Sequence, residues 1–107
     1  MSPTARTLRE CRRRGWIAQV VEQTVPKTFI KRDFLGVIDV IAITPDGILG
    51  IQCTSGTNHA ARVSKALEEP RLIAWLKAGG KFAVWSWSKT GARGQRKLWT
   101  LREEELF

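Results

Sequence analysis

Cysteine, histidine and long apolar runs are scarce in this 107-residue chain, and each shortage excludes a class of protein. Cys11 and Cys53 are the two cysteines, and neither has Cys or His partners at zinc-ligand spacing, which argues against a disulfide scaffold and a structural zinc site. His59 is the sole histidine, so no triad is built around a second one. No apolar run approaches the roughly 20 residues that span a bilayer, and residues 1–10 lack the apolar core of a signal peptide. We therefore expect a cytoplasmic protein with no membrane partner.

Acidic residues are the minority charge. Eighteen Lys and Arg residues against ten Asp and Glu residues give a net charge of +8, and three of the acids lie together at residues 103–105. Such a surplus favours a polyanionic partner, nucleic acid first and an anionic membrane surface second, over a merely soluble, highly charged domain. Apolar residues at 43% and charged residues at 26% are typical of a globular chain, and the length suits one domain over residues 1–107.

Hydrophobic periodicity and turn residues predict the order of the elements. The pattern predicts a helix over 4–14, a strand over 16–25, a loop over 26–35 that is a candidate binding loop, strands over 36–43 and 48–55, a helix from about 57 that is kinked or restarted at Pro70, a strand over 81–88, a basic glycine-rich loop over 89–97, a short strand over 98–101 and a tail that is helical or loose. The central helix is long enough to connect two parallel strands. We therefore expect an α/β (α+β) fold with a mixed β-sheet flanked by helices.

Polar residues interrupt two neighbouring buried strands. Asp39 lies in the apolar run GVIDVIAI, and Gln52 and Thr54 share one face of the next strand. An unpaired buried carboxylate costs several kcal/mol, so Asp39 requires a partner, which is either a hydrogen-bonding loop or a metal ion. Mg²⁺ takes carboxylate, amide and backbone carbonyl oxygens, which Asp39, Gln52 and the Cys53 carbonyl offer.

The register of the central hairpin decides whether these groups meet. If Asp46 and Gly47 form a two-residue turn, Asp39 opposes Thr54 and shares its face with Gln52. If Gly47 is instead a bulge after a type I turn, which Pro45 favours, Asp39 lies on the other face. In that second register, a metal site requires a kink or bulge near Asp39.

With this order of elements, the GVID and IQCTS segments resemble the PD-(D/E)XK nuclease superfamily, in particular its archaeal-type and phage-encoded Holliday-junction-resolvase-like proteins. The resemblance covers residues 4–88. It implies a restriction-endonuclease-like αβββαβ core, a homodimer that cuts branched DNA in recombination, and a Mg²⁺ or Mn²⁺ ion that positions the attacking water.

The family motif maps onto the two central strands residue by residue. Asp39 matches the metal-binding aspartate, and Gln52 matches the first position of the Glu-x-Lys (or Gln-x-Lys) pair. Thr54 stands where the family has its lysine, and Lys65 on the following helix is the candidate replacement, although a solvated helix face is the simpler interpretation of that residue. A further acid of the metal site is matched by Glu10 or Glu22.

Basic residues near helix ends and loops are the candidate DNA contacts. They are Arg12, Arg13, Arg14, Lys31, Arg32, Arg62, Lys89, Arg93, Arg96 and Lys97. Trp85 and Trp87 share one strand face and are expected to pack under a helix, and His59 is expected on the surface at a helix start. Two functions follow: a Mg²⁺-dependent DNA endonuclease acting on branched DNA, or a nuclease-like DNA-binding module that is catalytically impaired by the missing lysine.

Overall fold

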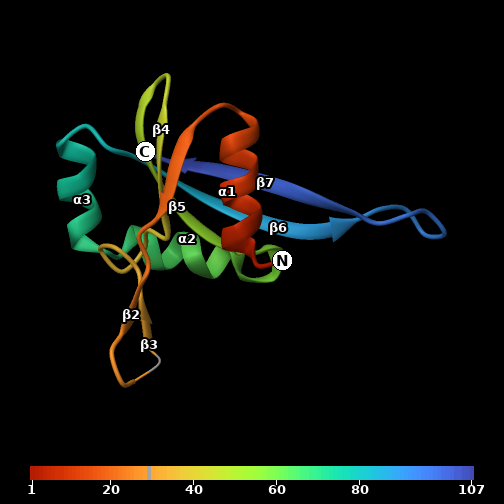
Figure 1. Cartoon of the computed structure of the whole chain (residues 1–107), viewed down its shortest axis with the longest axis horizontal. Coiled ribbons are helices and arrows are strands. Elements are labelled where there is room, and N and C mark those ends of the chain that lie inside the picture. Colours follow the sequence, from red (N-terminus) through yellow and green to blue (C-terminus); the bar gives the residue numbers. More distant parts are fainter. Residues whose placement is uncertain (29) are drawn as a thin grey trace.

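A mixed sheet of five strands forms the centre of the computed structural model, which describes residues 1–28 and 30–107 (Figure 1). The strand order is β1-β4-β5-β6-β7, in which β5 and β6 are parallel and the other neighbours are antiparallel. The elements are α1 (Pro3–Arg13), β1 (Ile17–Val20), β2 (Gln23–Val25), β3 (Ile30–Arg32), β4 (Val40–Thr44), β5 (Gly47–Ser55), the 3-10 turn η1 (Gly56–Asn58), α2 (His59–Leu67), α3 (Pro70–Lys77), β6 (Lys81–Thr90) and β7 (Leu98–Leu106). The predicted α+β class with a mixed sheet is confirmed.

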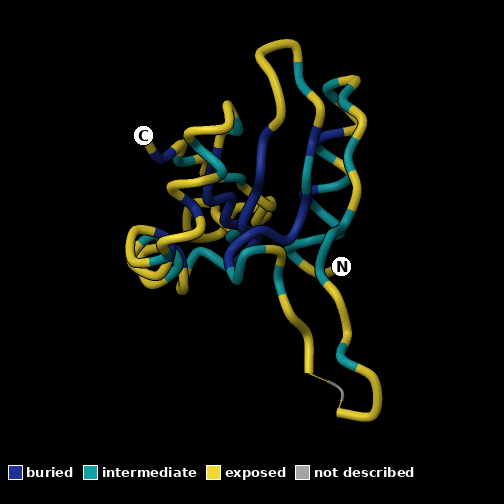
Figure 2. Tube along the Cα trace, turned by 90° about the vertical axis from the view of Figure 1, so that its left-hand side faces the viewer, coloured by how far each residue is buried: buried dark blue, intermediate teal, exposed yellow. Residues whose placement is uncertain are grey.

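Helices cover both faces of this sheet. Because side chains alternate along a strand, β6 sends Trp85 toward a core shared with Cys11 of α1, and Val84 toward a core shared with Ala66 and Leu72 of α2 and α3. Figure 2 shows the central strands buried between these layers, while the β2–β3 hairpin is exposed along most of its length. The α1 side and the α2–α3 side therefore form two separate surfaces.

The chain between the first strand and the hairpin is more structured than the sequence indicated. The predicted strand over 16–25 is two strands, because β1 pairs with β4 whereas β2 leaves the sheet and pairs with β3. At the point where the β1–β4 ladder ends, the Val21 N–H donates to the Asp39 carbonyl at 2.8 Å. The predicted loop over 26–35 thus contains β3, and its Phe29 lies outside the described residues. The result is a β-hairpin that projects from the body (Figure 1).

The acidic C-terminal segment is a strand, not a helical or loose tail. β7 runs to Leu106, which pairs with Phe82, and Glu103 pairs with Trp85 of β6. β7 is the last strand in the sheet order, so its outward-facing positions accept charged residues without burying them. The predicted short strand over 98–101 therefore continues to Leu106, and the pairing with β6 defines the part whose charged residues give no strand pattern.

Both hairpin registers considered from the sequence are wrong. Val40 pairs with Ile51 and Thr44 with Gly47, so the two loop residues are Pro45 and Asp46, and Gly47 takes a φ of +128° that favours glycine. The Asp39 N–H donates to the Ile51 carbonyl at 2.9 Å although Val40 is the partner of Ile51, and two residues opposing one is the arrangement of a β-bulge.

Candidate metal centre

Asp39 directly precedes β4 and is buried, with 3% of its surface exposed. Its Oδ2 accepts a hydrogen bond from Gln52 Nε2 at 2.7 Å and another from the Cys53 backbone N–H at 2.8 Å. Thr54, the next residue on the Gln52 face of β5, is also buried. The bulge therefore brings together the polar residues that interrupt the two central strands.

Two further carboxylates converge on Asp39. Glu22 lies at the break between β1 and β2, Asp33 follows β3, and ligand oxygens of the three acids all lie within 4.8 Å of one another. Asp33 Oδ2 is also 3.5 Å from Gln52 Nε2. Sequence reasoning missed Asp33, and the available signal was an acid within the segment already singled out as a binding loop.

Glu22, not Glu10, is the acid that joins this group. Glu10 lies on α1, where its two carboxylate oxygens accept hydrogen bonds from Arg13 and Arg14 at 2.6 to 2.8 Å. These bonds, the one to Arg13 foremost, lower the pKa of Glu10 to about 2. Its charge is already satisfied on the opposite side of the sheet.

Two groups at this site carry an electrostatic cost, although Lys31 Nζ lies 3.4 Å from Glu22 Oε1 and offsets part of the negative charge. Burial, followed by the hydrogen bond and charge of Asp33, raises the pKa of Asp39 to about 8, against the opposing effect of the Cys53 N–H. In the described part of the chain, the Gln52 Oε1 atom is buried without a hydrogen-bond partner. A cation would remove the first cost because it favours the ionised carboxylates, and with the Gln52 amide turned so that Oε1 takes the place of Nε2 it would remove the second as well.

The donor types at this site fit a hard divalent cation such as Mg²⁺ or Mn²⁺. Glu22, Asp33 and Asp39 supply carboxylates, and Gln52 supplies an amide that can present either its nitrogen or its oxygen. The N–H and C=O of one residue in an antiparallel strand point to the same neighbour, so the Cys53 carbonyl also faces the edge where Asp39 lies.

A basic hollow of about 390 Å³ includes Asp33, one of the three carboxylates, in its lining. Lys65 on α2 lines the same hollow. Its lining residues are Lys31, Arg32, Asp33, Gly36, Lys65 and Arg71. Gly36 has a φ of +74°, and a Cβ there would lie 3.0 Å from Arg71 Nη2, so glycine allows the loop to approach that arginine.

The other candidate DNA contacts are dispersed. Arg13 pairs with Glu10, and Arg14 bridges Glu10 and Glu103 at 2.8 Å each, so both charges are partly neutralised within the protein. Arg12 is exposed on α1 and Arg62 is half-buried on α2. The remaining four are exposed on the arm formed by the ends of β6 and β7, which projects to the right in Figure 1: Lys89, Arg93, Arg96 and Lys97.

His59 is buried, not on the surface as its position at a helix start suggested. Its Nδ1 lies 2.6 Å from Ser86 Oγ and its Nε2 lies 2.9 Å from Glu104 Oε1. Ser86 is 1% exposed, so this serine–histidine–glutamate contact has no access for a substrate and instead ties α2 to β6 and β7. The packing prediction for the tryptophans is confirmed, since Trp85 is buried beneath α1 and the Trp87 indole N–H donates to Thr7 Oγ1 at 3.0 Å.

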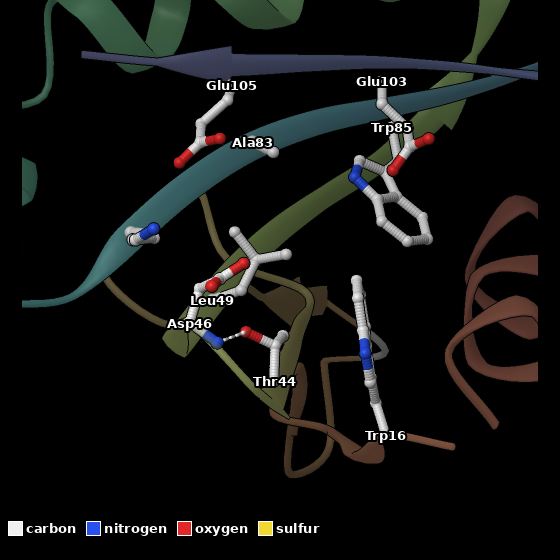
Figure 3. Close-up of a pocket in the computed structure, with 9 residues that line it drawn as sticks. Trp16, Thr44, Asp46, Leu49, Ala83, Trp85, Glu103 and Glu105 are labelled. Atoms are coloured by element: carbon white, nitrogen blue, oxygen red, sulfur yellow. Dashed lines mark hydrogen bonds between the residues drawn. The ribbon is translucent and has the colours of Figure 1, made fainter. Parts of the chain in front are cut away.

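A second hollow, of about 350 Å³, lies on the α1 side of the sheet (Figure 3). Trp16 and Trp85 form one wall, and the carboxylates of Asp46, Glu103 and Glu105 approach it from the hairpin loop and from β7. Like-charge repulsion makes this lining unsuitable for a phosphate backbone. The basic hollow beside Asp33 is the better site for phosphate.

Comparisons of the chain with protein-family models, with curated proteins and with solved structures find no match. Among the described residues, none of the helices has the length and apolar content needed to cross a membrane.

Proposed function

We propose that this protein is a divalent-metal-dependent DNA endonuclease. The observation that carries the proposal is the convergence of Glu22, Asp33 and Asp39 on Gln52, beside a hollow lined by basic side chains. Hydrolysis of a phosphodiester needs both features: oxygen donors for a cation, and positive groups for the phosphate.

Each group has a distinct part in the proposed reaction. When bound, Mg²⁺ or Mn²⁺ supplies water activation and neutralises negative charge on the phosphate. The three carboxylates and the Gln52 amide hold the ion, and Asp39 is kept in orientation by the Cys53 N–H. Lys65 contacts the phosphate from the hollow and stabilises the negative charge that develops as the P–O bond breaks.

Two exposed arms support a DNA substrate. The β2–β3 hairpin carries Lys31 and Arg32 next to the carboxylates, and the β6–β7 arm carries four further basic residues. Exposed basic arms bind phosphate backbones without a requirement for sequence. The preference for branched DNA rests on the resemblance to Holliday-junction-resolvase-like nucleases.

A homodimer belongs to the same proposal, and an uncharged row of isoleucines supports it. Ile17, Ile43 and Ile48 lie side by side across β1, β4 and β5 and are 73%, 56% and 49% exposed. Two copies of a chain with a charge of +8 can meet there without bringing like charges together. Ile43→Lys should convert the dimer to a monomer in sedimentation-velocity experiments, and a wild-type protein that sediments as a monomer would refute the dimer.

The decisive experiment is a nicking assay on linear, single-stranded and four-way DNA with Mg²⁺ or Mn²⁺, and with chelator as blank. Asp39→Asn should abolish cleavage while leaving DNA affinity equal or higher, since it removes a negative charge near phosphate. Glu10→Gln is the matched control, because it also neutralises an acid but lies outside the metal centre. A folded Asp39→Asn protein that cuts at the wild-type rate would move the active site elsewhere.

The second candidate function is a DNA-binding module without cleavage. The observation that favours it is Thr54, which is 5% exposed and occupies the position of the family's lysine. Wild-type protein that binds four-way DNA yet leaves it uncut with either metal would establish this alternative. If Thr54→Lys then gains cleavage activity, the wild-type site lacks only the positive charge of the lysine side chain.

A further inference from the structure

Another basic hollow, of about 360 Å³, lies where α1 meets β6 and has an aromatic wall. Arg6, Arg9 and Arg13 project from successive turns of α1, and the half-buried ring of Trp87 lines the hollow from β6. Thr7 fixes the orientation of that ring by accepting the indole N–H at 3.0 Å. An aromatic surface of fixed orientation is thus surrounded by three guanidinium groups.

The charges of this hollow are not cancelled by its one acid. Glu10 accepts hydrogen bonds from Arg13 at 2.6 and 2.8 Å, which holds the Arg13 guanidinium in place, and it also pairs with Arg14. Arg9 remains exposed at the rim. The Arg6 Nε atom is buried and, within the described residues, has no hydrogen-bond acceptor.

The aromatic and basic character continues onto the β6–β7 arm. The Arg6 guanidinium lies 3.7 Å from the centroid of the Trp99 ring, and Lys89 Nζ lies 5.6 Å from the same centroid. In Figure 1, the N-terminal end of α1 lies next to β6 where the arm leaves the body. A ligand seated against Trp87 can therefore extend along the arm toward further cations.

This surface is separate from the metal centre. Trp87 and Trp85 lie on the α1 face of β6, whereas Gln52 and Asp39 belong to the face covered by α2 and α3. A strand of nucleic acid held at α1 is consequently on the other side of the sheet from the carboxylates.

We propose that the α1–Trp87 hollow binds a single-stranded segment of nucleic acid, with one base stacked on Trp87 and the neighbouring phosphates held by Arg9 and Arg13. Alternating aromatic and cationic groups match the alternation of base and phosphate along a single strand. In a duplex the base faces are stacked within the helix and cannot reach the ring. An acidic peptide would use the guanidinium groups but leave the ring without a partner.

The test is fluorescence anisotropy of labelled oligo-deoxythymidine with chelator present and in the Asp39→Asn background, so that neither cleavage nor the metal centre contributes. Arg9→Ala should weaken binding by about tenfold, the scale of one lost hydrogen bond between charged groups. Arg12→Ala is the matched control, since it removes the same charge from the same helix outside the hollow, and it should weaken binding less than about twofold. Polyglutamate of equal charge should compete poorly, because it offers carboxylates to the guanidinium groups but no base to the ring of Trp87.

Three outcomes would overturn the proposal. Equal losses in Arg9→Ala and Arg12→Ala would show diffuse electrostatic attraction instead of a site. Competition by polyglutamate as effective as that by oligo-deoxythymidine would assign the hollow to an acidic peptide. Wild-type protein that does not bind the oligonucleotide would exclude the single-stranded ligand, and because the assay is free of metal, none of these results bears on the endonuclease.

Discussion

Replacement of Asp39 by asparagine should abolish stabilisation of the fold by a divalent cation. The asparagine side chain is nearly isosteric with that of aspartate, and its amide oxygen can still accept the Cys53 N–H, but the change removes one of the three converging carboxylates. In the absence of metal, the melting temperature of the variant should equal or exceed that of the wild type, because burial and neighbouring acids already oppose ionisation of Asp39.

The magnitude follows from linkage. A ligand that binds only the folded state at a concentration of about 100 times its Kd stabilises that state by about 2.7 kcal/mol. For a domain near this size, each kcal/mol shifts the melting temperature by about 4 °C. Mn²⁺ should therefore raise the wild-type melting temperature by about 10 °C at such an excess and leave that of Asp39→Asn unchanged.

The assay is thermal unfolding followed by circular dichroism, in chelator and in increasing Mn²⁺, with Glu10→Gln as the control. Glu10→Gln should retain the full rise because Glu10 lies outside the metal centre. An equal rise in Asp39→Asn would place the bound ion elsewhere. A wild-type melting temperature that is insensitive to Mn²⁺ up to saturating concentrations would refute the metal site itself, independently of any activity measurement.

Three further predictions concern the basic hollow, α1 and the arm. Lys65→Ala should lower the single-turnover cleavage rate by about two orders of magnitude or more, the scale of a lost charged stabiliser, and a loss below about tenfold would return Lys65 to a solvated helix face. Glu10 contributes stability that is present above its unfolded pKa of 4.5 and is lost as pH falls toward its folded pKa of about 2. Between pH 5 and pH 2, the free energy of unfolding in urea should therefore fall less in Glu10→Gln than in the wild type. Identical losses in the two proteins would refute this role of Glu10. Replacing the four basic arm residues by serine should flatten the log–log salt dependence of DNA binding by up to about three to four units with little change in melting temperature, whereas an unchanged slope would show that the arm does not meet phosphate. These four are Lys89, Arg93, Arg96 and Lys97.

Elements with a clear local hydrophobic pattern could be predicted from the order of residues. Apolar runs specified two neighbouring strands, although the first begins only at Val40 and not at residue 36 as predicted. Pro70 indicated either a kink or a new helix, and it begins α3, where its missing N–H is not needed. The polar interruptions marked Asp39 and Gln52 as candidate site residues, because buried polar groups must be satisfied, but they did not establish that the two meet. This much depends only on residues that are neighbours along the chain.

Tertiary structure alone decided how distant segments meet. Glu22 and Asp33 are separated by an exposed hairpin with little apolar content, and only the departure of β2 from the sheet and the return of β3 bring both acids to Asp39. The Pro45–Asp46 loop likewise set a hairpin register that differs from both registers considered from the sequence. Strand registers and chain reversals depend on pairing energies summed over many residues. A local pattern of apolar and polar residues does not determine these sums.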